Sequence, residues 1–158
     1  MINSLKKGIS FGLTSGVITT LGLIVGLNSG THSRPVVIGG ILTIALADAF
    51  SDALGIHVSE EADHRHSAHQ VWVATIATFF TKLFFSLTFL LPIIFFQLSH
   101  AIMISLVWGL VILVALSYFI AKVQKSSPVK VIFEHVLIAM VVIIATHFLA
   151  FWISSIFK

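Results

Sequence analysis

The stretch VVIGGILTIALADAFSDALGIHV, residues 36–58, decides how this chain folds. A helix that crosses the hydrocarbon of a bilayer needs about 20 mostly apolar residues, and this stretch is long enough. Two carboxylates, Asp48 and Asp52, lie one helical turn apart within it. An ionised group at membrane depth costs about 3 kcal/mol on insertion scales, so such groups usually face a bundle interior or an aqueous path. We therefore expect a spanning helix whose carboxylates are the first candidates for function.

The composition indicates an integral membrane protein. Hydrophobic residues make up 58% of the 158-residue chain and charged residues only 9%. Five stretches are long and apolar enough to span a bilayer, and the segments that join them are short. We expect an all-α bundle of five transmembrane helices without a soluble domain, with spans at about residues 8–27, 36–58, 71–97, 101–121 and 131–156.

The distribution of basic residues predicts the orientation of the bundle. Cytoplasmic loops of membrane proteins carry an excess of Lys and Arg. A cytoplasmic N-terminus and an external C-terminus place six basic residues inside and two outside, so topology accounts for the net charge of +3 and no basic patch suggests nucleic acid as a partner. The inside set is Lys6, Lys7, Arg65, Lys122, Lys125 and Lys130, and the outside set is Arg34 and Lys158.

The first predicted span carries two rows of glycines. The glycines stand at positions 8, 12 and 16 and then at 22, 26 and 30, with a change of phase between the rows. Small residues at four-residue spacing let helix backbones approach closely in lipid, where packing drives association. The rows therefore predict tight helix packing.

The depth of each polar residue follows from the 1.5 Å rise per residue. Asp48 and Lys82 each lie about 15 Å from the cytoplasmic end of their predicted spans. They are plausible ion-pair partners, and direct contact with a substrate is an equal alternative. On the predicted helix the carboxylates share one face with Ser51, Gly55 and Ser59.

Asp52 is shallower, about 9 Å from the same end. It is level with Thr14 and Ser15 of the first span, which we expect to be polar residues of the same pathway. No second lysine is available for it, which makes Asp52 the better candidate for a cation ligand or proton carrier. The alternative is a protonated acid hydrogen-bonded to a hydroxyl of the first span.

The segment SEEADHRHSAHQ, residues 59–70, is the only strongly polar loop. Carboxylate and imidazole ligands together suit Mn²⁺, Fe²⁺ or Zn²⁺ better than Mg²⁺ or Ca²⁺. Short polar loops between spans are often only solvated caps, so metal capture is one of two alternatives. The candidate ligands at this end are Glu60, Glu61, Asp63, His64 and, at the start of the last span, Glu134.

Several other classes of protein are disfavoured. The chain has no cysteine, which excludes disulfides and thiolate metal sites. It contains no Ser-His-Asp order, no Gly-rich phosphate loop and no HExxH pattern, so we do not expect an enzyme. Pro92 predicts a kink late in the third span. A lone histidine on an apolar helix, such as His147, is more often a hydrogen-bonded packing residue than a ligand, and we assign His147 no functional role.

Four segments together resemble the vacuolar iron transporter family. They are GLTSGVITTLGLIVGL (12–27), GGILTIALADAFSDALGIHVSEEAD (39–63), LTFLLP (87–92) and SPVKVIFEHVLIAM (127–140). The resemblance implies five spans, a cytoplasmic N-terminus and a homodimer with the ion path between subunits. It also implies movement of Fe²⁺ or Mn²⁺ out of the cytosol in exchange for protons. Ser51–Ser59 is the most recognisable piece, and Glu134 stands where the family commonly has a glutamate.

The chain also departs from the family pattern. Thr14, Ser15 and Gly16 replace the aspartate and glycine that many members have in the first helix. Ile44 and Asp52 stand where the family has a glutamate and a methionine, and Asp48 is added on the same face. The cytoplasmic metal-binding insert is reduced to the loop 59–70, and Lys82 is unexpected. Loss of a thioether and gain of a carboxylate favour harder ions such as Mn²⁺.

These observations predict a homodimeric, multi-pass transporter of Fe²⁺ or Mn²⁺ driven by proton exchange, without a permanently bound cofactor, in a plasma, inner or vacuole-like membrane. Asp48 and Asp52 would line the path, with Lys82 balancing Asp48 until a cation displaces it. The acids of residues 59–70 and Glu134 would form the cytoplasmic entry. The alternatives are a non-transporting membrane scaffold on the same fold and a transporter of a different solute, with Lys82 contacting an anion.

Overall fold

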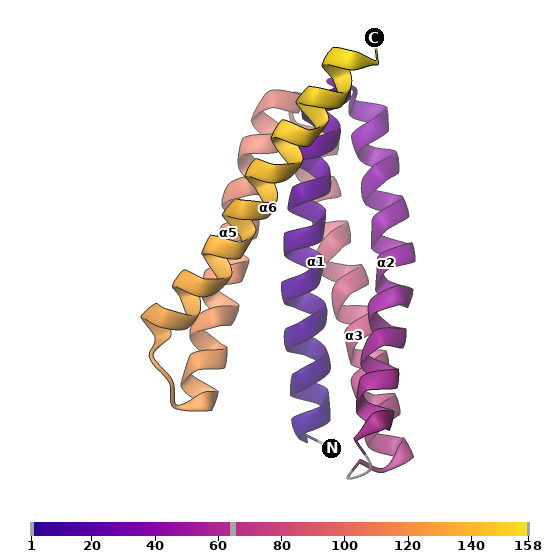
Figure 1. The fold of residues 1–158 in the computed structure, drawn as a ribbon, viewed down its shortest axis with the longest axis vertical. Coiled ribbons are helices and arrows are strands. Elements are labelled where there is room, and N and C mark those ends of the chain that lie inside the picture. Colours follow the sequence, from indigo (N-terminus) through magenta and orange to yellow (C-terminus); the bar gives the residue numbers. More distant parts are fainter. Residues whose placement is uncertain (1, 64–65, 158) are drawn as a thin grey trace.

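The computed structural model describes residues 2–63 and 66–157, and the described chain contains helices and no strand (Figure 1). Five helical segments are long and apolar enough to cross a membrane, as predicted. The third of them consists of two helices separated by one residue. The elements are α1 (Ile2–Thr31), α2 (Arg34–Ala62), α3 (Ala68–Thr88), α4 (Leu90–Phe95), α5 (Leu98–Gln124) and α6 (Pro128–Ile156).

The helices are longer than the apolar stretches that predict them. In particular, α2 continues to Ala62, so Glu60 and Glu61 lie on its last turn and not in a loop. The next helix begins at a capping box, in which the Ser67 side chain accepts from the Gln70 N–H and the Gln70 side chain accepts from the Ser67 N–H. These caps shorten the polar connection that the sequence predicts.

Helix α1 is the central element of the bundle (Figure 1). It packs against α2 and α3 on one side and against α5 and α6 on the other. The α5–α6 hairpin diverges from α1, and the divergence is greatest at the N-terminal end of α1. Only Ala139 of α6 is fully buried, so most of this helix is left for lipid or another chain.

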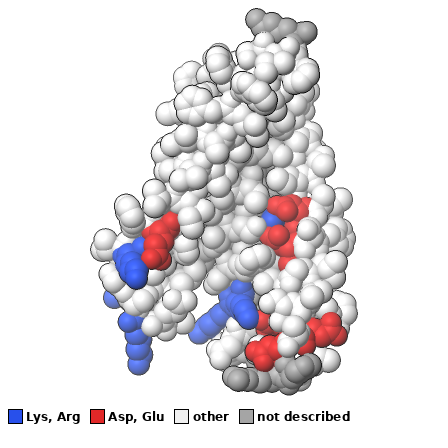
Figure 2. All heavy atoms as spheres, in the orientation of Figure 1, with Lys and Arg blue, Asp and Glu red and all other residues white. Residues whose placement is uncertain are grey.

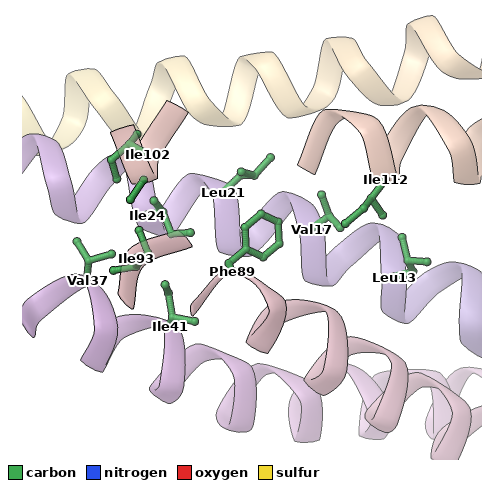
Figure 3. Packing of buried hydrophobic residues seen from close by; sticks show 11 residues of the cluster. Leu13, Val17, Leu21, Ile24, Val37, Ile41, Phe89, Ile93, Ile102 and Ile112 are labelled. Carbon is green, nitrogen blue, oxygen red and sulfur yellow. The ribbon is translucent and has the colours of Figure 1, made fainter. Parts of the chain in front are cut away.

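A hydrophobic cluster joins α1 to the other elements (Figure 3). Leu21 and Ile24 of α1 are fully buried and lie among side chains from α2, α4 and α5. Close packing of such side chains replaces the hydrophobic driving force that is missing between helices in lipid. The cluster also includes Leu13, Val17, Val37, Ile41, Phe89, Ile93, Ala101, Ile102 and Ile112.

The two glycine rows of α1 contact two different helices, which confirms the predicted tight packing. A Cβ at Gly12 would lie 2.6 Å from the Thr78 carbonyl oxygen of α3. A Cβ at Gly26 would lie 3.5 Å from the Thr146 Cβ of α6. The six-residue step from Gly16 to Gly22 falls roughly 120° short of two full turns, so the second row lies on a different side of the helix.

The break between α3 and α4 confirms the predicted effect of Pro92. Proline has no N–H, so Pro92 cannot donate to the Thr88 carbonyl four residues earlier. The chain tightens instead, and the Phe89 N–H donates to the Ser86 carbonyl at 3.3 Å. The break places the Phe89 ring in the hydrophobic cluster.

Candidate functional site

A polar seam runs between α1 and α3. Thr78, Lys82 and Ser86 stand four residues apart on α3, and all three are buried. They face the first glycine row of α1, and a Cβ at Gly16 would lie only 3.3 Å from the Lys82 Cγ. The absence of side chains in this row therefore makes room for the stem of a fully buried lysine.

The ammonium group of Lys82 joins three helices. Its Nζ lies 2.5 Å from Asp48 Oδ2, contacts Asp52 Oδ2, and donates to Ser15 Oγ at 2.8 Å. Two of its three donors are used in hydrogen bonds to Asp52 and Ser15, whereas Asp48 Oδ2 is an ion-pair contact without a hydrogen bond among the described residues. The predicted pairing of Asp48 with Lys82 is confirmed. The prediction that Asp52 lacks a lysine is wrong, because carboxylates one turn apart on α2 are close enough to share one ammonium.

The resulting site is acidic and only partly enclosed. Two carboxylates share one ammonium, so the ionised site has a formal charge of −1. Lys82 is inaccessible, whereas the Asp48 and Asp52 side chains are 27% and 18% exposed. In Figure 2, acidic and basic atoms form several separate patches in the lower half of the view, while the upper half shows neither colour. The carboxylates can therefore be approached from outside this single chain.

Thr14 and Ser15 are adjacent on α1 but face different neighbouring helices. Ser15 contacts Lys82, as described above, whereas Thr14 donates to the Ser10 carbonyl at 2.8 Å and lines a groove toward α5. Only Ser15 of the predicted pair therefore belongs to the carboxylate site. The seam continues away from that site as a hydrogen bond of 3.0 Å from Thr20 to Ser86, which the sequence analysis missed. The four-residue spacing of Thr78, Lys82 and Ser86 in the sequence could have predicted a polar row on one face of α3.

A second charged cluster lies near the start of α1. Glu60 is 1% exposed, pairs with Lys7 of α1, and lies 3.2 Å from His66 Nδ1 through its other carboxylate oxygen. Glu61 and Asp63 are exposed beside it. His64 lies outside the described residues. Glu60 is thus already neutralised by the neighbouring helix, while Glu61 and Asp63 lie at the surface.

Glu134 belongs to a separate region of the molecule. It lies 4.0 Å from Lys130 in an i,i+4 pair on α6, and its side chain is about half exposed. The start of α6 is on the far side of α1 from α2 and α3 (Figure 1), and acidic atoms form separate patches in Figure 2. Within residues 2–63 and 66–157, no group of three or more His, Asp or Glu side chains is arranged to hold a metal ion.

Three histidines connect neighbouring helices through hydroxyl groups. Nδ1 of His147 lies 2.7 Å from the Ser29 Oγ, so this histidine is hydrogen-bonded to a neighbouring helix. His135 pairs with Ser117 in the same way at 2.8 Å, and His57 pairs with Thr75 at 3.0 Å. Interhelical hydrogen bonds of this type stabilise helix association in membranes.

The fold has five helices long and apolar enough to span a membrane, which is consistent with a multi-pass membrane protein, and a partly exposed acidic site lies between α1, α2 and α3. No protein-family model matches the chain, and no curated protein matches it. The chemistry available to the site is therefore argued from its geometry. Two carboxylates and a hydroxyl can bind a cation, and a lysine can occupy the same position or release a proton.

Proposed function

We propose that this protein is a homodimeric transporter that moves Fe²⁺ or Mn²⁺ out of the cytosol in exchange for protons. The observation that carries the proposal is the sharing of Lys82 by Asp48 and Asp52 at the middle of long apolar helices. Ionisable residues in such positions usually mark ion or proton pathways. The proposal also agrees with the resemblance of the sequence to vacuolar iron transporters.

Charge balance suggests how ion binding is coupled to protons. With Lys82 protonated, the site has a formal charge of −1, and a divalent ion would raise that charge to +1. If the ion displaces Lys82 and the ammonium loses one proton, the loaded site becomes neutral. The exchange is balanced, because one divalent ion enters and one proton leaves while the net charge of protein, ion and proton is unchanged. A neutral site costs least in an apolar bundle.

The donor atoms favour a hard ion. Asp48, Asp52 and Ser15 supply oxygen ligands, which suit Mn²⁺ better than a thioether-containing site would. The exposed acids Glu61, Asp63 and Glu134 would raise the local concentration of cations at the cytoplasmic end without forming a fixed binding site.

The outer face of α2 supports the proposed homodimer. Small residues recur every four positions along this face, and all of them are exposed. A Cβ at Gly39 or Gly55 would have no neighbour within 4 Å. Packing of this row against its copy would bring two acidic sites together, because Asp48 and Asp52 each directly follow a member of the row. The row is Gly39, Thr43, Ala47, Ser51, Gly55 and Ser59.

The direct test is uptake of Mn²⁺ and Fe²⁺ into proteoliposomes with an imposed pH gradient. We expect uptake that follows the gradient and is lost in the Asp48→Asn/Asp52→Asn double variant. Ser105→Ala is the matched control, because Ser105 is a buried polar residue of α5 without a hydrogen-bond partner among the described residues. Absence of uptake by folded, dimeric protein, relative to empty liposomes, would contradict the proposal.

A non-transporting membrane scaffold is the second candidate, and one observation favours it. Lys82 forms ion pairs with both carboxylates, so the two acids already have a counter-charge without a metal ion. Heating the purified protein with and without Mn²⁺ separates the two functions. A ligand that binds only the folded state stabilises it by about 2.7 kcal/mol at 100 times its Kd, so a transporter should melt at a higher temperature with Mn²⁺. A scaffold should not respond, and the double variant gives the baseline.

A further inference from the structure

We propose that the groove between α1 and the α5–α6 hairpin binds one anionic phospholipid, with the phosphate at Lys6 and an acyl chain along α5. This inference goes beyond metal transport and does not depend on it. The groove has a volume of about 760 Å³ and lies where the hairpin leans away from α1 (Figure 1). It is on the opposite side of α1 from the carboxylate site.

The walls of the groove suit an acyl chain. One wall is the part of α1 from Lys6 to Thr14 and the other is the part of α5 from Leu116 to Gln124. Each part spans about 12 Å along its helix axis, which gives a channel rather than a shallow dent. Six of the twelve lining residues are apolar, so an acyl chain lying there would make close contacts with their side chains. They are Ile9, Phe11, Leu116, Phe119, Ile120 and Val123. Thr14 and His135 also line the groove, and both are already hydrogen-bonded within the protein.

The mouth of the groove is basic. Lys6 and Lys7 are the charged residues among those that line it, and both lie at the end where α1 begins. Lys7 is paired with Glu60, whereas Lys6 is exposed and forms no ion pair within the described residues. Gln124 adds an amide donor across the groove. Basic pockets between transmembrane helices bind the phosphates of anionic lipid headgroups.

Charge and polarity together favour a lipid over other occupants. A second copy of this chain that placed the same face here would bring one basic mouth against another. A free phosphate would gain nothing from the apolar walls. An anionic phospholipid matches both parts, because its phosphate meets Lys6 and its chain lies on the Phe119 and Ile120 side chains.

The test is native mass spectrometry of the purified full chain with phosphatidylglycerol or phosphatidylcholine of identical acyl chains. We expect phosphatidylglycerol to bind at about fivefold lower concentration, the factor that one lysine contributes near an anionic group. Lys6→Gln should remove this preference. Lys125→Gln is the matched control, because Lys125 is exposed on the same side of the bundle and does not line the groove. Ile120→Trp should fill the groove and reduce binding of both lipids.

Three results would overturn the proposal. The first is equal binding of the two lipids, or an equal effect of Lys6→Gln and Lys125→Gln, which would indicate nonspecific attraction. The second is displacement of phosphatidylglycerol by glycerol 1-phosphate at similar concentration, which would indicate a free-phosphate site. The third is lipid binding by the monomer that is lost in the dimer, which would indicate that a second copy covers the groove.

Discussion

Lys82 supplies the single ammonium group that compensates the charges of Asp48 and Asp52 between the apolar helices. Removal of one partner from a buried charge pair costs about 3–5 kcal/mol, because the other charge is left without compensation. We expect Lys82→Met to lower the free energy of unfolding by about 3 kcal/mol, the low end of that range, since both carboxylates remain partly exposed. Chemical unfolding in detergent micelles, followed by circular dichroism, measures this loss.

Two variants test the reason for that loss. Addition of Asp48→Asn and Asp52→Asn to Lys82→Met removes the uncompensated charges and should recover most of the stability. Lys130→Met removes a lysine from an exposed i,i+4 pair and should cost at most about 0.5 kcal/mol. A Lys82→Met protein as stable as Lys130→Met would mean that the ammonium does not neutralise the two acids.

Counting residues from the cytoplasmic end of each predicted span identified one of the two carboxylates that contact Lys82. Equal depth paired Asp48 with Lys82, and the contact is present. The same count separated Asp52 from Lys82, because it treats depth along each helix axis and ignores the reach of a long side chain across one helical turn. Ser15 was placed at the right level, but depth alone could not show that it faces α3 while Thr14 faces α5.

At the scale of elements, the glycine rows of α1 set how closely its neighbours approach. A Cβ at Gly12 would lie 2.6 Å from the Thr78 carbonyl oxygen and 3.2 Å from the Lys82 backbone nitrogen, both of α3. Backbone cannot move aside as a side chain can, so α1 and α3 must separate. We expect Gly12→Ala to destabilise the protein by about 1–3 kcal/mol, the usual cost of overpacking. The midpoint of thermal unfolding in detergent reports the change.

Gly26→Ala is the matched control on the same helix. Its Cβ would make an ordinary contact of 3.5 Å with the Thr146 Cβ. Alanine also has a higher helix propensity than glycine, by about 1 kcal/mol. Gly26→Ala should therefore leave stability unchanged or raise it slightly. If both variants lose the same stability, the close approach of α1 to α3 is not what requires glycine at position 12.

The elements were more predictable than their arrangement. Apolar length identified all five spans, and Pro92 located the break in the third. Helix ends differed: α2 continues to Ala62 beyond its apolar part, and this last turn carries Glu60, which pairs with Lys7. The lean of the α5–α6 hairpin had no signal in hydropathy. The lean depends on which glycine row of α1 packs against which helix. The spacing of the glycines predicts two rows but does not show which helix packs on each.

At the scale of the whole molecule, the exposed small-residue row of α2 distinguishes one face of the bundle from the rest. Large exposed apolar side chains flank the row on α2 itself, such as Leu46 and Phe50, and also cover other faces, such as Phe80 of α3, as expected of surfaces that meet lipid. Small residues let two helices approach closely. A copy packed on this row would place the acidic sites of two subunits beside each other, so assembly and ion binding would be coupled.

The chain contains no cysteine, which allows a direct test of this interface. Single substitutions Thr43→Cys, Ala47→Cys, Ser51→Cys and Gly55→Cys each introduce one thiol on the row. A disulfide requires Cα atoms about 4.4–6.8 Å apart, so only positions near a two-fold crossing of α2 with its copy can link. We expect mild oxidation in membranes to yield covalent dimers at one or two adjacent positions of the four. Phe80→Cys, exposed on α3, should stay monomeric on denaturing gels. If the protein is dimeric by mass and none of the four positions links, the two-fold axis lies elsewhere and each acidic site must work within its own subunit.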